Sequence, residues 1–408
     1  MHFGAAARRR VAVKRGVAVN VAAVCPLARR LVLSGMVLLG SFPAARGAEG
    51  PASRPADVPG RQVRPIPAFW KSSLADVEQA VAAVRKGKVQ VLAESAGGRK
   101  IHLVSYGAAR ELKSQATYSS ALGAGSPAWY AHKPPGTPPA VLLLGPVHGQ
   151  ELEGVAGMVN LIHLVETGKD LRGRAWPGLT KSVERCRVLI VPCANPDGRA
   201  RVALDSFIGE SLNTYEYYGM GTTADGRVRN WPRVKRRQPM VGDVGFLGGY
   251  FNDAGVNLMH DDWFGRMAPE NAAILDLARR EAVDYGLSLH SHGGRPAMYQ
   301  TDFMAPTCQE KLILLSERVS RRFAAMKHRL NPIDRRMPST QPAGQEPESF
   351  NLCSALHQVC GGAFAVYENA SGIPGYHKTT HEEILDLQMA LFEELMTFAA
   401  ENPVVWKR

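Results

Sequence analysis

Apolar segments of strand length alternate with helical segments along most of this 408-residue chain. Runs that predict strands lie at residues 88–95, 99–107, 140–145, 186–193, 285–292 and 362–368. Apolar residues at helical spacing predict helices at residues 73–87, 154–167, 268–282, 310–326 and 379–401. Buried strands that alternate with helices are typical of an α/β domain. We therefore predict one α/β domain whose central sheet, mostly parallel or mixed, is covered by helices on both faces.

The first 48 residues differ in composition from the rest of the chain. They hold eight basic residues and no acidic one, and the apolar stretch Leu31–Phe42 leads into small residues at 44–48. This order predicts a secretory signal peptide that is cut near Gly47 or Ala48, and hence a secreted or periplasmic protein. A basic organellar transit peptide and a start codon placed too early are the alternatives. The apolar stretch is shorter than the ~20 residues of a membrane helix, so we expect no stable membrane span after its removal.

The segment between this leader and the first predicted helix is rich in proline. We expect residues 49–68 to form a linker and residues 69–408 to form the folded domain. Removal of the leader lowers the formal net charge from +12 to +4, because its eight basic residues have no acidic counterpart. The charge of the mature chain therefore does not indicate a nucleic-acid partner. The oligomeric state stays open.

Three of the predicted strands end in residues that can bind a metal or transfer a proton. The strand at 140–145 leads into His148 and Glu151, the strand at 285–292 carries His290, and the strand at 362–368 ends on Glu368. Such side chains gather at the carboxyl edge of an open α/β sheet. Catalytic zinc sites commonly take three protein ligands and leave one position for water, whose pKa the ion lowers. We predict one zinc ion held by His148, Glu151 and His290, with Glu368 as the proton acceptor.

Each of these residues also has a structural interpretation. The spacing His-x-x-Glu occurs often by chance. His290 could be a satisfied core histidine, and Glu368 could cap a helix or pair with an arginine. His292 points to the same side of an extended strand as His290 and is a second candidate ligand. The occurrence of matching chemistry at three separate strand ends favours the metal site.

The order of these motifs resembles the zinc metallocarboxypeptidase family of the carboxypeptidase A type. The matching segments are GRKIHLVSYG (98–107), HGQE (148–151), NPDG (195–198), GVNL (255–258), LSLHSHGG (287–294) and AVYENASG (365–372). The resemblance implies a carboxypeptidase-like domain that acts on a peptide or amide substrate. It implies zinc ligands at His148, Glu151 and His290, and a general base at Glu368 that activates water and delivers the proton to the leaving amine. It makes NPDG a structural turn near the site.

A basic stretch, RVRNWPRVKRR (227–237), resembles the family segment whose arginine stabilises the tetrahedral oxyanion. The resemblance makes Arg233 the first choice for this catalytic role. Arg236 and Lys235 are the next choices, because the local alignment has a gap. A solvated charged loop is the alternative, since charge runs are often surface features.

Three departures from the family concern substrate recognition and the metal site. Met259 and His260 stand where typical members have an Asn-Arg pair that binds the C-terminal carboxylate. A histidine is mostly neutral near pH 7 and offers a carboxylate less than arginine does. We expect His260 and Arg236 to contact substrate. Asn257 replaces an aspartate that orients the first zinc-binding histidine, and the family's active-site tyrosine has no match in residues 341–355.

These features predict a secreted zinc peptidase that hydrolyses an amide bond by metal-activated water. One alternative is an amidase or deacylase that acts on cell-wall peptides or acyl amino acids. Another is an ordinary carboxypeptidase whose carboxylate anchor has moved to another cation, such as Arg295, Arg229 or His260. A zinc-retaining binding protein with little turnover is a further alternative, but the presence of Glu368 argues against it, because a binding protein needs no base beside its metal.

Overall fold

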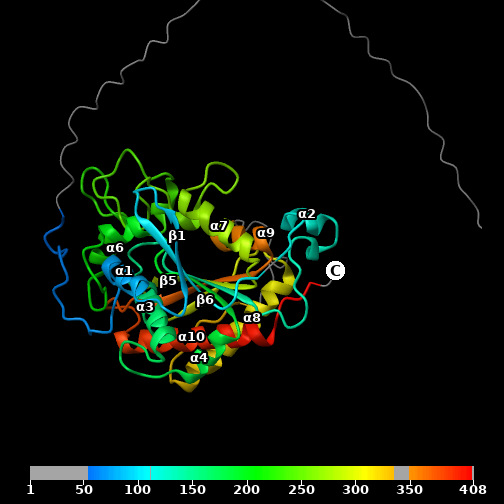
Figure 1. The fold of residues 1–408 in the computed structure, drawn as a ribbon. Coiled ribbons are helices and arrows are strands. Elements are labelled where there is room, and N and C mark those ends of the chain that lie inside the picture. The colour runs from blue at the N-terminus through cyan, green and yellow to red at the C-terminus, as the bar shows by residue number, and fades with distance from the viewer. Residues whose placement is uncertain (1–53, 111, 335–348, 407–408) are drawn as a thin grey trace, which may run out of the picture. The chain divides into compact units, whose positions relative to one another are not determined.

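A seven-stranded mixed sheet forms the centre of the domain, with the strand order β1-β2-β4-β3-β5-β7-β6 (Figure 1). The computed structural model describes residues 54–110, 112–334 and 349–406. The strands are β1 (Lys88–Glu94), β2 (Lys100–Tyr106), β3 (Ala140–Leu144), β4 (Arg187–Val191), β5 (Tyr285–His292), β6 (Ala297–Tyr299) and β7 (Ala363–Ala370). The four central strands β4, β3, β5 and β7 are parallel, whereas β1, β2 and β6 join by antiparallel pairing.

Helices cover both faces of this sheet, which confirms the predicted α/β architecture. One face carries α1 (Leu74–Ala82), α3 (Leu152–Thr167), α4 (Pro177–Glu184), α8 (Pro306–Ala325) and α10 (His381–Glu401). The other face carries α2 (Tyr118–Gly123), α7 (Pro269–Glu281) and α9 (Leu352–Cys360). The connection between β4 and β5 contains α5 (Pro196–Arg201), α6 (Leu212–Met220) and the 3-10 turns η2 (Arg233–Arg236) and η3 (Leu258–His260), and a further 3-10 turn, η1 (Pro127–Trp129), follows α2.

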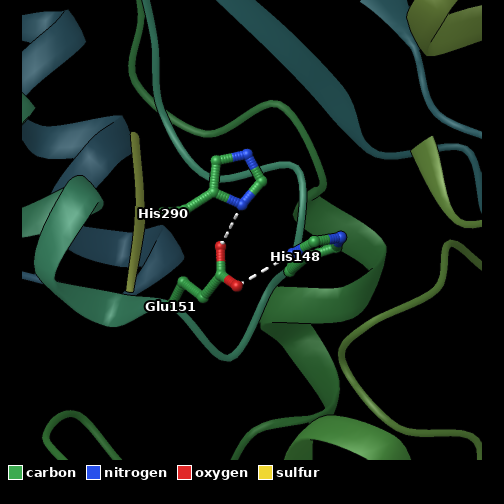
Figure 2. Close-up of side chains that lie close together, drawn as sticks. All are labelled: His148, Glu151 and His290. Carbon is green, nitrogen blue, oxygen red and sulfur yellow. Dashed lines mark hydrogen bonds and ion pairs between the residues drawn. The ribbon is translucent and has the colours of Figure 1, made fainter. Parts of the chain in front are cut away.

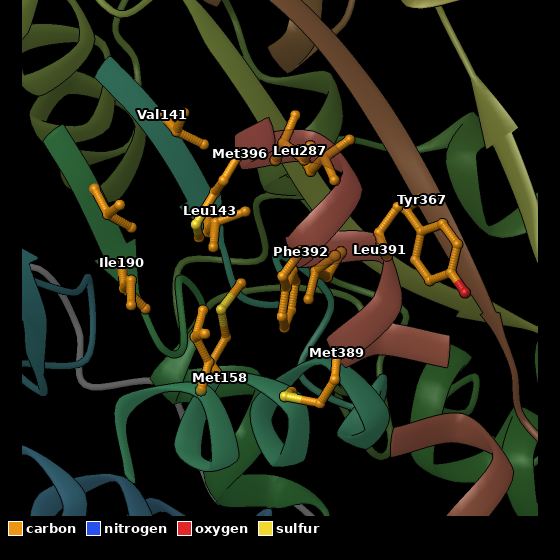
Figure 3. Close-up of a cluster of buried hydrophobic side chains, with 14 of the residues drawn as sticks. Val141, Leu143, Met158, Ile190, Leu287, Tyr367, Met389, Leu391, Phe392 and Met396 are labelled. Atoms are coloured by element: carbon orange, nitrogen blue, oxygen red, sulfur yellow. The ribbon is translucent and has the colours of Figure 1, made fainter. Parts of the chain in front are cut away.

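The alternation of side chains along the central strands decides which face receives the polar residues. In β5, Leu287 and Leu289 belong to the apolar cluster under α3 and α10 (Figure 3), so the next residue, His290, lies on the opposite face. In β7, Tyr367 joins the same cluster, and Glu368 therefore lies on the face of His290. The parallel register places Glu368 directly opposite His290. Packing of the apolar residues thus brings two chemically active side chains together.

The proline-rich segment lies against the domain wherever it is described. Val58 is 2% exposed, and the side-chain oxygen of Gln62 accepts a hydrogen bond of 2.9 Å from the backbone N–H of Asp205. Residues 54–68 therefore differ from the free linker that their composition predicts, because apolar burial and side-chain hydrogen bonds hold them in place. Residues 1–53, which include the expected signal peptide, lie outside the described residues. Within the described ranges, no helix combines the length and apolar character that a membrane crossing requires.

Candidate metal centre

His148, Glu151 and His290 converge at the carboxyl edge of the sheet, as the sequence predicts (Figure 2). The Nδ1 atom of His148 lies 2.8 Å from Oε1 of Glu151, and Nδ1 of His290 lies 3.0 Å from Oε2 of the same carboxylate. One candidate ligand atom from each residue lies within 4.8 Å of the others. All three side chains are buried. The structure therefore gathers two imidazoles around one carboxylate from two separate segments of the chain.

The turn that carries His148 is packed tightly against α5, which begins with the NPDG sequence. A Cβ atom at Gly149 would lie 2.0 Å from the backbone nitrogen of Arg199, so only glycine fits this close approach. The side-chain amide of Asn195 donates a 2.9 Å hydrogen bond to the carbonyl of Val147. The NPDG segment thus holds the metal-binding turn in position, in agreement with the structural role that the sequence predicts for it.

Asn257 fixes the tautomer of His148. Its Oδ1 atom accepts a hydrogen bond of 3.0 Å from the backbone N–H of Met259, which identifies this atom as the oxygen of the amide. The same oxygen lies 3.1 Å from Nε2 of His148, so Nε2 carries the proton of the neutral ring. The Nδ1 atom, on the side of Glu151, then keeps a lone pair that it can donate to a metal ion. The Tyr250 ring stacks on the imidazole, with the ring centroids 3.8 Å apart. Asn257 can thus orient this histidine despite being an amide.

The charge and hydrogen bonding of the cluster suit a divalent cation. Burial alone raises the pKa of Glu151, but the neighbouring His148 and His290 outweigh it and lower the pKa to about 2. The carboxylate is therefore ionised at neutral pH. Its two oxygen atoms lie 2.8 Å and 3.0 Å from the Nδ1 atoms of His148 and His290. Imidazole nitrogens and a carboxylate oxygen are a preferred donor set for zinc, and a cation bound among these three enclosed groups would satisfy their lone pairs.

Glu368 lies beside this cluster and is set up for proton transfer near neutral pH. Burial raises its pKa to about 7, and the carboxylates of Glu151 and Glu153 contribute to the rise, against the opposing effects of His290 and Lys235. Its Oε2 atom is enclosed and has no hydrogen-bond partner within the described ranges. A carboxyl group whose pKa lies near the working pH can both accept and donate a proton.

Among the basic residues at 227–237, Lys235 interacts electrostatically with the carboxylates of Glu368 and Glu151. Burial lowers the pKa of its ammonium group, whereas Glu368 and Glu151 oppose that change. Its Nζ atom lies 5.1 Å from the centre of the Trp231 ring. Arg233, Lys235 and Arg236 are all exposed, and none of the three forms an ion pair with a carboxylate within the described part of the chain. Lys235 is the one of the three for which an electrostatic interaction with Glu368 and Glu151 is resolved.

His260 faces the same site from η3. Burial lowers its pKa to about 3, and electrostatic interactions with Lys235, His148 and His290 add to this effect. The imidazole is therefore neutral at pH 7. A neutral ring offers a substrate hydrogen bonding but no fixed positive charge, so His260 is a weak partner for a free carboxylate.

The other cations considered as anchors for a substrate carboxylate either form an ion pair within the protein or lie away from the metal centre. Arg229 pairs with Asp243 at 3.4 Å. Arg295 lines a cavity beside Tyr367, whose side chain lies on the face of the sheet opposite Glu368. His292 lies outside the group of converging ligand atoms, and its Nε2 is 2.7 Å from the carbonyl oxygen of Arg295.

Three residues that the sequence did not single out also lie near the metal centre. The Tyr215 hydroxyl donates to the carbonyl of Ser291 at 3.1 Å, and burial raises the pKa of this tyrosine, as do the nearby carboxylates. Tyr250 stacks on His148. Glu153 is fully buried, and burial raises its pKa to about 7. The sequence offered one signal for Glu153: it lies two residues after Glu151, directly before a predicted helix whose residues are mostly apolar.

Of residues 341–355, where the family tyrosine has no match, only those from 349 on are described.

Comparisons with known proteins place the chain in a family. A family model described as zinc carboxypeptidase matches residues 79–345, which include the three candidate ligands and end before Glu368. A metallo-carboxypeptidase from Burkholderia cenocepacia is 14% identical, with 80% of this chain and 67% of that chain covered and a TM-score of 0.48. Carboxypeptidase A from Helicoverpa armigera is 14% identical, with 82% and 75% covered and a TM-score of 0.49. A search among curated proteins found no match.

Substitution of any one candidate ligand should remove the metal. Zinc-loaded protein is expected to retain one ion per chain after dialysis, whereas the variants His148→Ala, Glu151→Gln and His290→Ala retain far less, because a zinc site rarely holds with two protein ligands. Elemental analysis by mass spectrometry measures the bound zinc. The variant His292→Ala is the matched control and should keep the ion. Equal zinc loss in His290→Ala and His292→Ala would argue against the assignment.

The raised pKa of Glu368 should make the metal-free protein less stable as the pH rises. The folded state keeps a proton that the unfolded chain releases near its ordinary pKa of 4.5, so stability is lost between pH 4.5 and about 7. Glu368→Gln removes this titration. The variant should therefore gain stability over the metal-free parent across that window, by on the order of 1–3 kcal/mol. Urea unfolding at pH 5 and pH 8 measures the difference, and a difference that does not change with pH would contradict the burial of an unpaired carboxyl group.

Proposed function

The chain belongs to the zinc carboxypeptidase family, and from this premise we propose that it is a zinc-dependent hydrolase of amide bonds. The observation that carries the proposal is the arrangement at the carboxyl edge of the sheet. His148, Glu151 and His290 converge there, and the parallel register of β5 and β7 sets Glu368 beside them. A metal site with an unpaired carboxyl group next to it is suited to hydrolysis, whereas a metal that serves only structure needs no such group.

His148, Glu151 and His290 would hold the zinc through two imidazole nitrogens and a carboxylate oxygen. A zinc ion bound there supplies positive charge, which lowers the pKa of water and polarises a substrate carbonyl. Glu368 accepts the proton of the attacking water and then delivers it to the nitrogen of the leaving amine. Its pKa near 7 suits both directions of this transfer.

We assign Lys235, in place of Arg233, the stabilisation of the negative charge that develops on the substrate carbonyl oxygen. Both side chains are exposed, and the electrostatic interaction of Lys235 with Glu368 and Glu151 is what supports this role. A positive charge that is in place before the reaction needs no reorganisation at the moment when the substrate becomes negative. Lysine provides a single point charge here rather than the planar fork of an arginine.

The neutral His260 guides the substrate proposal. Because it stands where typical members bind the C-terminal carboxylate with arginine, the substrate is an amide whose recognition does not depend on that charge. Cell-wall peptides and acylated amino acids are substrates of this kind. Export to the periplasm or the exterior is proposed from the composition of residues 1–48 alone, and it would bring the enzyme to the first of these substrates.

Zinc-loaded mature chain, residues 49–408, should cleave amide bonds whether or not the substrate has a free C-terminal carboxylate. The experiment incubates it with peptides that carry free or amidated C-termini, with cell-wall peptides and with acyl amino acids, and identifies the products by mass spectrometry. The variant Glu368→Gln, which keeps the zinc, should give no products. A stepwise C-terminal ladder from free acids alone would contradict the substrate proposal and indicate an ordinary carboxypeptidase. Survival of every substrate would contradict the hydrolase itself and favour a binding protein.

Lys235 and Arg233 can be separated by kinetics. Lys235→Ala should lower kcat/KM on the order of 10²-fold or more, with zinc content unchanged, because the oxyanion loses its fixed cation. Arg233→Ala, a matched loss of one exposed positive charge from the same turn, should leave kcat/KM nearly unchanged. The opposite ranking of the two variants would return the catalytic role to Arg233.

A further inference from the structure

A cavity of about 210 Å³ is lined by Tyr367, Asn369 and Ala370 at the carboxyl end of β7. Neither the three candidate metal ligands nor Glu368 belongs to its lining. The remaining walls come from the β5–β6 connection, the segment after α8 and the loop before α10. Its volume is far larger than the roughly 10–15 Å³ that a single water needs.

Basic side chains gather around this cavity. Its lining includes Arg295, Lys327, His328, Arg329 and His377. Within residues 54–110, 112–334 and 349–406, Arg295, Lys327 and Arg329 form no ion pair. The cavity is therefore a place where several positive charges come together without counterions from the protein.

The cavity lining contains no acidic residue, and the acidic group Glu383 nearby caps a helix. Burial lowers the pKa of His377, and the positive charges of Arg295 and His328 lower it further, whereas Glu383 opposes them. The carboxylate of Glu383 accepts a 2.9 Å hydrogen bond from the backbone N–H of Thr380 and so caps α10. This carboxylate is held by the helix terminus, and within the described residues it forms no ion pair with a cation of the cavity.

The cationic walls are held by the fold rather than by a free loop. The backbone N–H of Met298 donates to the carbonyl of Asn331 at 3.0 Å, and the N–H of Asn331 donates to Pro296 at 2.8 Å. These bonds tie the segment after α8, which carries Lys327 and Arg329, to the start of β6, which follows Arg295. Lys327 has a φ of +65°, a conformation that glycine usually provides at the end of a helix. A lysine there accepts backbone strain, which is a feature of functional positions.

We propose that this cavity binds a multiply charged oxyanion, with phosphate and carboxylate groups as the two forms of that chemistry. Arginine side chains present a planar fork that matches both groups, and lysine adds a mobile point charge. The clustered cations repel one another while they lack counterions, so an anion bound among them removes an unfavourable interaction. This inference does not depend on the hydrolase activity, because no proposed ligand or catalytic side chain lines the cavity.

Isothermal titration calorimetry of the zinc-loaded mature chain at low ionic strength tests the proposal. The probes are inorganic phosphate for the phosphate form and succinate for the carboxylate form. At least one of them should bind at one site per chain, with affinity that falls on addition of NaCl. Metal-free protein should bind with the same affinity. Binding that disappears with the metal would place the anion at the metal centre and overturn the proposal, as would the absence of binding by both probes.

Two variants locate the bound anion. Lys327→Gly and Arg329→Ala should each weaken binding about tenfold or more, the loss expected for one charge-assisted hydrogen bond. Glycine adopts the positive φ at position 327 without strain, so Lys327→Gly should not harm folding. Arg321→Ala, which removes an exposed charge from α8 away from the cavity lining, is the matched control and should bind as the parent does. Binding that both cavity variants leave unchanged would overturn the assignment of the site.

Discussion

The parallel pairing of β5 with β7 is the constraint on which the candidate site depends. It sets Glu368 opposite His290, and a slip of one residue would send the carboxyl group to the other face of the sheet. The register is held by the apolar residues that alternate with these two, because they fill the cluster under α3 and α10. The adjacent pairing of β3 with β5 brings the turn that carries His148 and Glu151 to the same edge. The chemistry therefore follows from the packing of the core.

The sequence predicted those parts of the molecule that a periodic pattern records. The central strands, the long helices α3, α8 and α10, and the metal set of His148, Glu151 and His290 follow from apolar runs and from the rule that strand ends meet at one edge. Strand β6 has three residues, and α6 is rich in tyrosine without an apolar stripe, so neither has a readable period. The positions of Lys235 and Arg233 could not be read either, because the direction of each side chain in the turn η2 is set by tertiary contacts.

Desolvated carboxylates set the protonation of the candidate site and also limit its stability without metal. Glu151 is ionised beside two imidazoles, whereas burial raises the pKa of Glu368 and Glu153 to about 7. Buried acidic groups without partners cost folding free energy, and a cation that binds only the folded state offsets that cost. The lining of the cationic cavity carries the opposite sign of charge, on exposed side chains. At the metal centre the chain departs from the rule that buried charges are paired, and such departures are common at functional sites.

The central claim is that two histidines and one glutamate bind zinc at this edge of the sheet. The measurement that tests it most directly is X-ray absorption at the zinc edge of the zinc-loaded protein. The predicted spectrum shows two imidazole ligands together with oxygen donors, all at about 2.0–2.2 Å, and no sulfur. A sulfur ligand at about 2.3 Å, or a zinc ion with fewer than two imidazoles, would contradict the claim.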